Sequence, residues 1–237
     1  MYSFISRIRF SEVNKDKQLD FSSISNYFQD CSTFHSESLD VGISYLEKTN
    51  RVWMLSSWQI VVNRFGNLGE EIEIGTWAYG SDSLYAFRNF TMKTTSGEVL
   101  AYANAIWILV DTTTNSPTRI TPEYVGQYTL EEKYPMNYAP RKIKIPKDLT
   151  QFEPFTIMKG SIDSNNHVNN GQYIKMAEEY IPEGFKTKQL RADYRCSAVL
   201  GDEIIPLVHI EDNVCVVVLA NSEHKPYCIV EFTSTIL

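Results

Sequence analysis

The sequence predicts an α+β protein built from two tandem units, each a helix followed by a series of strands. Apolar residues recur with the i, i+3, i+4, i+7 spacing of an amphipathic helix in each half of the chain, over 24–34 and over 173–180. Strand-like runs separated by turn residues follow both helices. The connection between the first two strand-like runs of each half, called the joint below, is repeated. It lies at 63–72 in the first half and at 194–204 in the second. Because the strands follow one another and do not alternate with helices, the sheets should be mainly antiparallel.

The first helix follows a polar stretch in which Ser22 or Ser23 is expected to act as the cap. In the repeated joint, Arg64 aligns with Arg195 if one extra residue is allowed in the second copy. The predicted strands are 52–62, 71–77, 84–93 and 99–110 in the first half, and 189–195, 203–210, 214–220 and 227–236 in the second.

The stretch from Asp111 to Leu149 lies between the two units and is rich in threonine, tyrosine and proline, without sustained periodicity. Such composition is typical of a connection between domains. We therefore expect an N-terminal domain over 1–130, a linker over 131–148 and a C-terminal domain over 149–237.

Composition excludes several classes of protein. With 43% hydrophobic residues and a net charge of −7, the chain is of ordinary globular character and lacks the basic surface that nucleic acids or anionic membranes require. No signal-like start and no run long enough to span a membrane occurs, so we expect a soluble, cytoplasmic protein that is not exported. The four cysteines form no C-x-x-C pair, so we expect no metal and no cofactor.

The segment from Asp163 to Asn170 is the strongest candidate for chemistry, because the serine-hydrolase, phosphate-loop, dinucleotide and zinc-protease motifs are all absent. If the segment is extended, Asp163, Asn165 and His167 point to one side, just before the second helix. A carboxylate or imidazole can deprotonate water there, while amide donors polarise a carbonyl. The alternative is a polar loop that only caps the helix.

The run Asp-x-Asn-x-His-Val-Asn-Asn-x-x-Tyr, from Asp163 to Tyr173, resembles the catalytic segment of the acyl-acyl carrier protein thioesterases of plants and bacteria. Segments of the first half resemble the same family, among them 76–77, 88–90 and 107–120. The resemblance implies two tandem hotdog folds, each a long helix wrapped by a curved antiparallel sheet. It also implies hydrolysis of fatty acyl thioesters, with the acyl chain bound in the first half and one active site, at Asp163, Asn165 and His167.

One position departs from the family pattern. The family's strand motif Tyr-Arg-x-Glu-Cys corresponds to 194–198, and Ser197 stands where a glutamate that positions or activates water is expected. A serine is no base near neutral pH without a partner. Either Asp163 and His167 suffice, or activity is lowered, or a nearby carboxylate substitutes. The candidates for that carboxylate are Asp202, Glu203 and Glu179.

The resemblance makes an acyl carrier protein the expected partner. Because carrier proteins are acidic, an acidic enzyme needs a local basic landing site. The candidates are Arg141, Lys142, Lys144, Lys186 and Lys188. Four questions stay open at this point: which of Asp163 and His167 is the base, whether the carrier is a protein or coenzyme A, whether the chain only binds acyl groups without catalysis, and whether it forms a homodimer.

Overall fold

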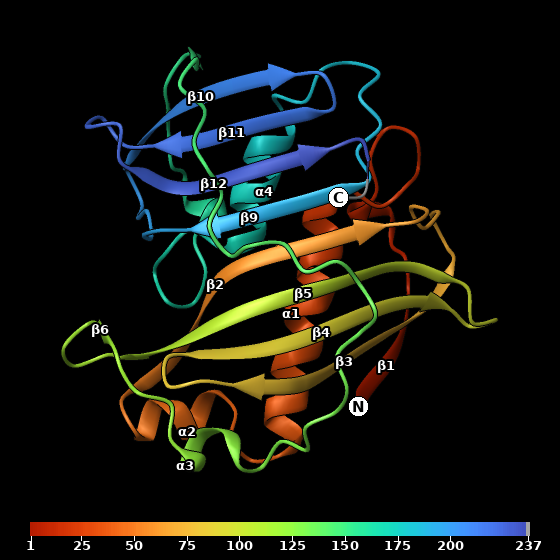
Figure 1. Ribbon diagram of the computed structural model, residues 1–237, viewed down its shortest axis with the longest axis vertical. Helices are drawn as coiled ribbons and strands as arrows, with labels where there is room; N and C mark the ends of the chain where they lie inside the picture. Colours follow the sequence, from red (N-terminus) through yellow and green to blue (C-terminus); the bar gives the residue numbers. More distant parts are fainter. Residues whose placement is uncertain (236–237) are drawn as a thin grey trace. The chain divides into compact units, whose positions relative to one another are not determined.

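The computed structural model describes residues 1–235 and divides into two compact units. The N-terminal unit comprises Met1–Ser56 and Val62–Tyr138, and the C-terminal unit comprises Ser57–Val61 and the residues from Ala139 onward. Each unit contains a helix packed on an antiparallel sheet (Figure 1). The predicted α+β class and the tandem repeat are therefore confirmed.

In the N-terminal unit, helix α1 packs against a sheet of order β1-β3-β4-β5-β2. Every pairing recorded among these strands is antiparallel. Its elements are β1 (Tyr2–Arg7), the 3-10 turn η1 (Phe10–Glu12), α1 (Phe21–Ser38), α2 (Ile43–Lys48), β2 (Arg51–Val62), β3 (Glu71–Ser81), β4 (Tyr85–Thr94), β5 (Val99–Asp111), β6 (Ser116–Pro117) and α3 (Pro122–Val125). The cap of α1 is Asp20 and not a serine, because the Asp20 side chain accepts a hydrogen bond from the Ser23 N–H.

The C-terminal unit repeats this order around helix α4. Its sheet runs β9-β12-β11-β10-β7, and residues 57–61 of β2 pair with the free edge of β9. The elements are β7 (Thr150–Gln151), β8 (Phe155–Thr156), η2 (Lys159–Ser161), α4 (Asn170–Glu178), β9 (Gln189–Tyr194), β10 (Glu203–Glu211), β11 (Val214–Ala220) and β12 (Pro226–Thr233). The strand predicted over 227–236 corresponds to β12, and Ile236 itself lies outside the described residues.

Each helix buries one face on its own sheet. In α1 this face includes Ile24, Phe28 and Cys31, and the Phe28 ring packs 5.2 Å from that of Phe90 in β4. Phe28 is fully buried, and such burial contributes about 1.5–3 kcal/mol for one large apolar side chain. The amphipathic spacing in the sequence therefore identifies the core face of the helix. Across the described residues, no helix is both long and apolar enough to cross a membrane.

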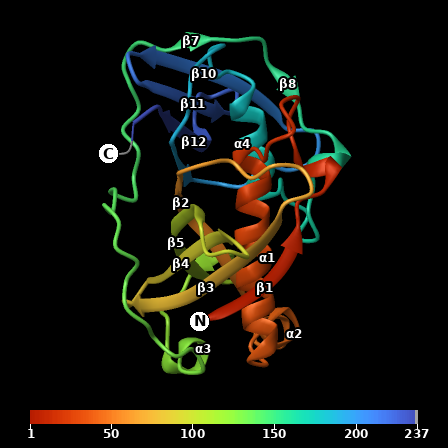
Figure 2. The ribbon, with the colours of Figure 1, turned by 90° about the vertical axis from the view of Figure 1, so that its right-hand side faces the viewer.

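The segment expected to be a linker, 131–148, is divided between the two units and held by hydrogen bonds. In the N-terminal unit the Asn89 Oδ1 accepts bonds from the Tyr134 N–H and the Tyr138 hydroxyl. Figure 2 shows this segment on the side of the sheet away from α1. In the C-terminal unit the Arg191 guanidinium donates to the carbonyls of Pro140 and Lys142. The segment is thus fixed to a sheet face within each unit, although it lacks periodic structure.

The repeated joint has the same backbone hydrogen bonds in both units. The Gly66 carbonyl accepts from the Leu19 N–H, and the Ala198 carbonyl accepts from the Val168 N–H, both at 2.9 Å. The glycine at the tip of each joint has a left-handed backbone, with φ of 81° at Gly69 and 88° at Gly201. Two residues therefore separate Gly66 from Gly69, and two separate Ala198 from Gly201, so neither joint has an insertion there.

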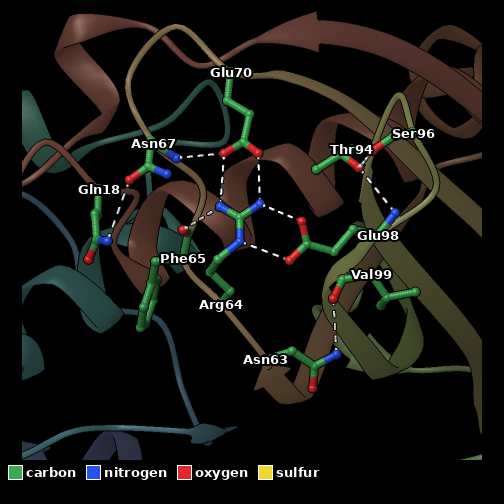
Figure 3. A network of polar contacts seen from close by, with 10 residues as sticks. All are labelled: Gln18, Asn63, Arg64, Phe65, Asn67, Glu70, Thr94, Ser96, Glu98 and Val99. Atoms are coloured by element: carbon green, nitrogen blue, oxygen red, sulfur yellow. Dashed lines mark hydrogen bonds and ion pairs between the residues drawn. The ribbon is translucent and has the colours of Figure 1, made fainter.

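The predicted alignment of Arg64 with Arg195 is wrong by one residue. The N–H groups of Asn63 and Arg64 both donate to one carbonyl, and those of Arg195 and Cys196 do the same in the other unit. Cys196 is thus the counterpart of Arg64, because the bonding pattern and not the shared residue type fixes the register. Arg64 lies between Glu70 and Glu98 and donates two hydrogen bonds to each (Figure 3). The C-terminal unit has no guanidinium at that position.

Candidate active site

Residues 163–167 form a compact turn directly before α4. The Asp163 N–H donates to the His167 carbonyl at 2.8 Å, and the Asp163 Oδ1 accepts from the N–H groups of Asn165 at 2.8 Å and His167 at 3.4 Å. Asn166 adopts a left-handed backbone with φ of 61°. The expectation of an extended segment is therefore wrong, because the aspartate bonds to the backbone that follows it and reverses the chain.

The turn is fixed at both ends. Ile162 and Val168 form an isolated antiparallel bridge across its base, and Asn169 caps α4 by accepting from the Gly171 N–H at 2.8 Å. Asp163 and His167 are half-buried, and Asn165 is exposed. The three predicted side chains thus lie on one short, closed turn at the start of a helix.

The N-terminal unit contains the same turn with different side chains. The Asn14 N–H donates to the Gln18 carbonyl at 2.8 Å, and its Oδ1 accepts from the N–H groups of Asp16 and Gln18 at 2.9 and 3.2 Å. Lys17 has φ of 60°, and Val13 and Leu19 form the bridge at the base. The turn is therefore a feature of the repeat, and its shape alone does not indicate catalysis.

What distinguishes the two turns is side-chain chemistry. Asn14, Asp16 and Gln18 occupy the places of Asp163, Asn165 and His167. The first position keeps the same acceptor oxygen in both units, as an amide in one and a carboxylate in the other. Only the C-terminal turn carries an imidazole, a group that can act as a general base.

The residues around the two turns also differ, and those around the C-terminal turn are the more polar. In the N-terminal unit the first residue of α1, Phe21, packs edge to face with Phe65 in the joint, with ring centroids 5.3 Å apart. The corresponding positions in the C-terminal unit are Asn170, the first residue of α4, and Ser197. Two phenyl rings are thus replaced by two small polar side chains beside the candidate turn.

Two further apolar positions become tyrosines in the C-terminal unit. Ile24, the fourth residue of α1, corresponds to Tyr173, and Val62, the last residue of β2, corresponds to Tyr194. The Tyr173 hydroxyl accepts from the Ala198 N–H at 2.7 Å, and the Tyr194 hydroxyl donates to the Asn170 carbonyl at 3.1 Å. Sequence reasoning assigned neither hydroxyl a role, although Tyr173 and Tyr194 both stand in the segments that resemble the family.

The predicted supporting residues lie at different places. Ser197 is half-buried and precedes Ala198, whose carbonyl accepts from the Val168 N–H, so it lies beside the turn. Glu179 follows the last residue of α4 and is about 13 Å along the helix from Asn170, at 1.5 Å per residue. The helix therefore separates Glu179 from the turn.

The two other carboxylates have structural surroundings. Glu203 begins β10 opposite Thr156 and is exposed. Asp202 closes the tip of the joint, where its Oδ2 accepts from the Val199 N–H at 2.9 Å and from the Tyr227 hydroxyl at 3.0 Å. Burial and this bond raise the pKa of Tyr227 to about 12, so the phenol remains a donor to Asp202 at neutral pH. Asp202 therefore bonds within the joint and to Tyr227, and no bond recorded among the described residues joins it to the candidate turn.

The predicted carrier-binding residues fall into two groups on β9 and beside it. Arg141, Lys142 and Lys144 belong to the segment fastened along β9, where the Ile143 N–H donates to Asp193. Lys186 and Lys188 precede β9, at the end opposite Tyr194, and are exposed. Lys188 lies about 20 Å along the strand from Tyr194, at about 3.3 Å per strand residue.

No group of three or more His, Cys, Asp or Glu side chains within residues 1–235 is arranged to hold a metal ion.

Two repeats of a helix on an antiparallel sheet, with a polar turn before the second helix, define a tandem hotdog protein. The chain belongs to the acyl-ACP thioesterase family: the family's N-terminal domain matches residues 2–128 and its C-terminal domain matches residues 146–225.

Curated relatives are plant enzymes of this family. The palmitoyl-acyl carrier protein thioesterase of Arabidopsis thaliana chloroplasts is 24% identical over 208 residues, which cover 79% of this chain and 50% of the relative. An oleoyl-acyl carrier protein thioesterase of the same plant is 25% identical over 211 residues, covering 79% and 57%. The chain therefore spans about half the length of the curated relatives it matches.

Solved structures share the fold over nearly the whole chain. An acyl-ACP thioesterase from Bacteroides thetaiotaomicron superposes with a TM-score of 0.90 at 21% identity, covering 98% of this chain and 96% of the other. The 12:0-ACP thioesterase of Umbellularia californica gives a TM-score of 0.81 at 18% identity, with the same coverages. At these identities the likeness establishes the tandem hotdog fold.

Proposed function

We propose that this chain hydrolyses fatty acyl thioesters of acyl carrier protein, releasing a free fatty acid and the carrier thiol. Family membership supports the reaction class, and the relatives' names supply the substrate class. The observation that carries the proposal is the difference between two turns of equal shape, of which only the C-terminal one has Asp163, Asn165 and His167.

The proposed reaction is direct attack by water. The His167 imidazole accepts a proton as the water oxygen attacks the thioester carbonyl carbon. Asn165 holds the water or the carbonyl in place, and its side-chain amide donates to the oxyanion. When the intermediate collapses, the carbon–sulfur bond breaks and the proton passes to the departing thiolate. Asp163 holds the backbone of Asn165 and His167.

The test is release of fatty acid from acyl carrier protein loaded with a defined chain. His167→Gln copies Gln18 of the other turn, so it keeps the fold and removes the base. We expect turnover to fall at least about 100-fold, the usual contribution of a general base. Gln18→Ala is the matched control and should leave the rate unchanged. Unaltered turnover in His167→Gln would overturn the site assignment.

The carrier is tested separately, by comparing the same acyl chain on acyl carrier protein and on coenzyme A. We expect the carrier protein to be preferred, with charge reversal at Lys142 and Lys144 weakening only that substrate. Equal loss with both substrates would remove these lysines from the landing site, and preference for coenzyme A would change the substrate class. The other predicted landing residues, a homodimer and a cytoplasmic location stay predictions, and the two relatives from Arabidopsis are described as chloroplastic.

A further inference from the structure

Tyr173 and Tyr194 place two hydroxyl groups in the interior of the C-terminal unit, directly behind the candidate turn. Tyr173 is 2% exposed, and its ring packs edge to face with that of Tyr194 at 6.0 Å. Tyr194 is half-buried as a whole, but its hydroxyl is deep, and burial raises its pKa well above the usual value. Burial likewise raises the pKa of Tyr173. Both phenols therefore stay protonated through the neutral range.

The fold itself does not require these hydroxyls. The N-terminal unit has the same helix, strand and joint with Ile24 and Val62 at the two positions, and its turn has the same hydrogen bonds. The N-terminal unit packs these positions with aliphatic side chains that need no hydrogen-bond partner, whereas a buried phenol costs free energy unless its hydroxyl is bonded. The two hydroxyls are thus not needed to form the turn, because the N-terminal unit forms it without them.

The two hydroxyls bond to the backbone at two places next to the turn, in the joint and at the start of α4. Tyr173 binds the Ala198 N–H, and the carbonyl of Ala198 in turn accepts from Val168, the residue after His167. Tyr194 donates to the carbonyl of Asn170, the first residue of α4. The Ser197–Ala198 backbone and the start of α4 are thereby fixed relative to each other, and His167 is three residues from Asn170.

We infer that Tyr173 and Tyr194 are positioning residues that hold the Asp163–His167 turn, Ser197 and the start of α4 in the geometry that hydrolysis needs. The inference rests on the proposed function. It assigns the tyrosines no contact with substrate, because their hydroxyls are bonded to the backbone. A small displacement of a base from its water is enough to slow a reaction strongly.

The test uses Tyr194→Phe and Tyr173→Phe, which keep each ring and remove each bond. We expect kcat to fall about 10-fold or more while KM changes by less than about 2-fold, since only the alignment of reacting groups is altered. Tyr79→Phe is the matched control, because the Tyr79 hydroxyl donates to Asn104 at 2.7 Å in the N-terminal unit. This control should leave kcat unchanged.

A double-mutant cycle separates positioning from a purely structural role. If Tyr194 acts through the turn, Tyr194→Phe should have little further effect on kcat in the His167→Gln background. Independent, multiplying effects of the two changes, or an unchanged kcat in both folded tyrosine variants, would overturn the inference. Absence of hydrolysis by the unaltered chain would instead overturn the proposed function, so the two failures are distinguishable.

Discussion

Asp163 has a structural task that is separable from any chemical one. Its Oδ1 holds the N–H groups of Asn165 and His167, as the amide oxygen of Asn14 does in the other turn. Asp163→Asn should therefore keep the stability of the protein, whereas Asp163→Ala should lower it by about 1–3 kcal/mol, because the backbone donors lose their partner. Denaturant unfolding of both variants measures the difference. Equal stability of the two would show that the side chain does not hold the turn.

At this scale the sequence predicts the candidate residues, but the geometry that their spacing suggested differs from the one in the structure. The order of Asp163, Asn165 and His167 suggested a common side of an extended segment. The left-handed backbone of Asn166 and the bonds of Asp163 make a turn instead. A run of Asp, Ser and Asn is typical of such turns, so the signal was present but was outweighed by the two-residue spacing.

The joint between β2 and β3 is the element with the clearest electrostatic support. Arg64 hydrogen-bonds Glu70 and Glu98, which lowers the pKa of both carboxyl groups. Because these pKa values are lower in the folded state, the stabilisation is present above the unfolded-state pKa and is lost as the pH falls through the folded-state values.

Arg64→Met should therefore reduce stability at neutral pH by a small amount, because the ion pairs are partly or fully exposed. The difference from the unaltered chain should shrink as the pH falls below about 4.5, where the carboxylates become protonated. Thermal unfolding of both proteins between pH 7 and pH 3 measures it. A difference that stays constant over this range would contradict the ion-pair account.

Elements were predictable because their periodicity is strong, but the register between the two joints was not. Matching Arg64 to Arg195 preserved a residue type and required an insertion. The backbone bonds of Leu19 and Val168 show that no residue is inserted. The residue type was misleading because the two joints have diverged: one keeps an arginine between two glutamates, and the other has Cys196 at that place.

On the scale of the whole chain, the two units share a fold and differ in interior polarity near the turn. Transfer of the three side chains alone should therefore not create a second site. In the His167→Gln background, Asn14→Asp, Asp16→Asn and Gln18→His together should not restore hydrolysis, because Phe21 and Phe65 fill the space beside that turn. The measurement is fatty acid release by the combined variant. Recovered turnover would show that the surroundings are unimportant.

The tandem repeat could be predicted from the amino-acid sequence alone, because a helix, a joint and a hairpin follow one another in the same order in both halves. The polar replacements around the second turn could not, since Tyr173 fits the apolar face of a helix and Tyr194 the end of a strand. Only a correct superposition of the two units reveals that both replace aliphatic residues. The difference in polarity between the two units is therefore seen in the structure and not in any single motif.

The central claim is that hydrolysis depends on the side chains by which the second turn differs from the first. The most direct test gives the C-terminal turn the side chains of the N-terminal one, by Asp163→Asn, Asn165→Asp and His167→Gln in a single variant. We predict a folded protein of unchanged stability whose release of fatty acid from acyl carrier protein falls at least about 100-fold. A folded variant that still releases fatty acid at the original rate would contradict the account.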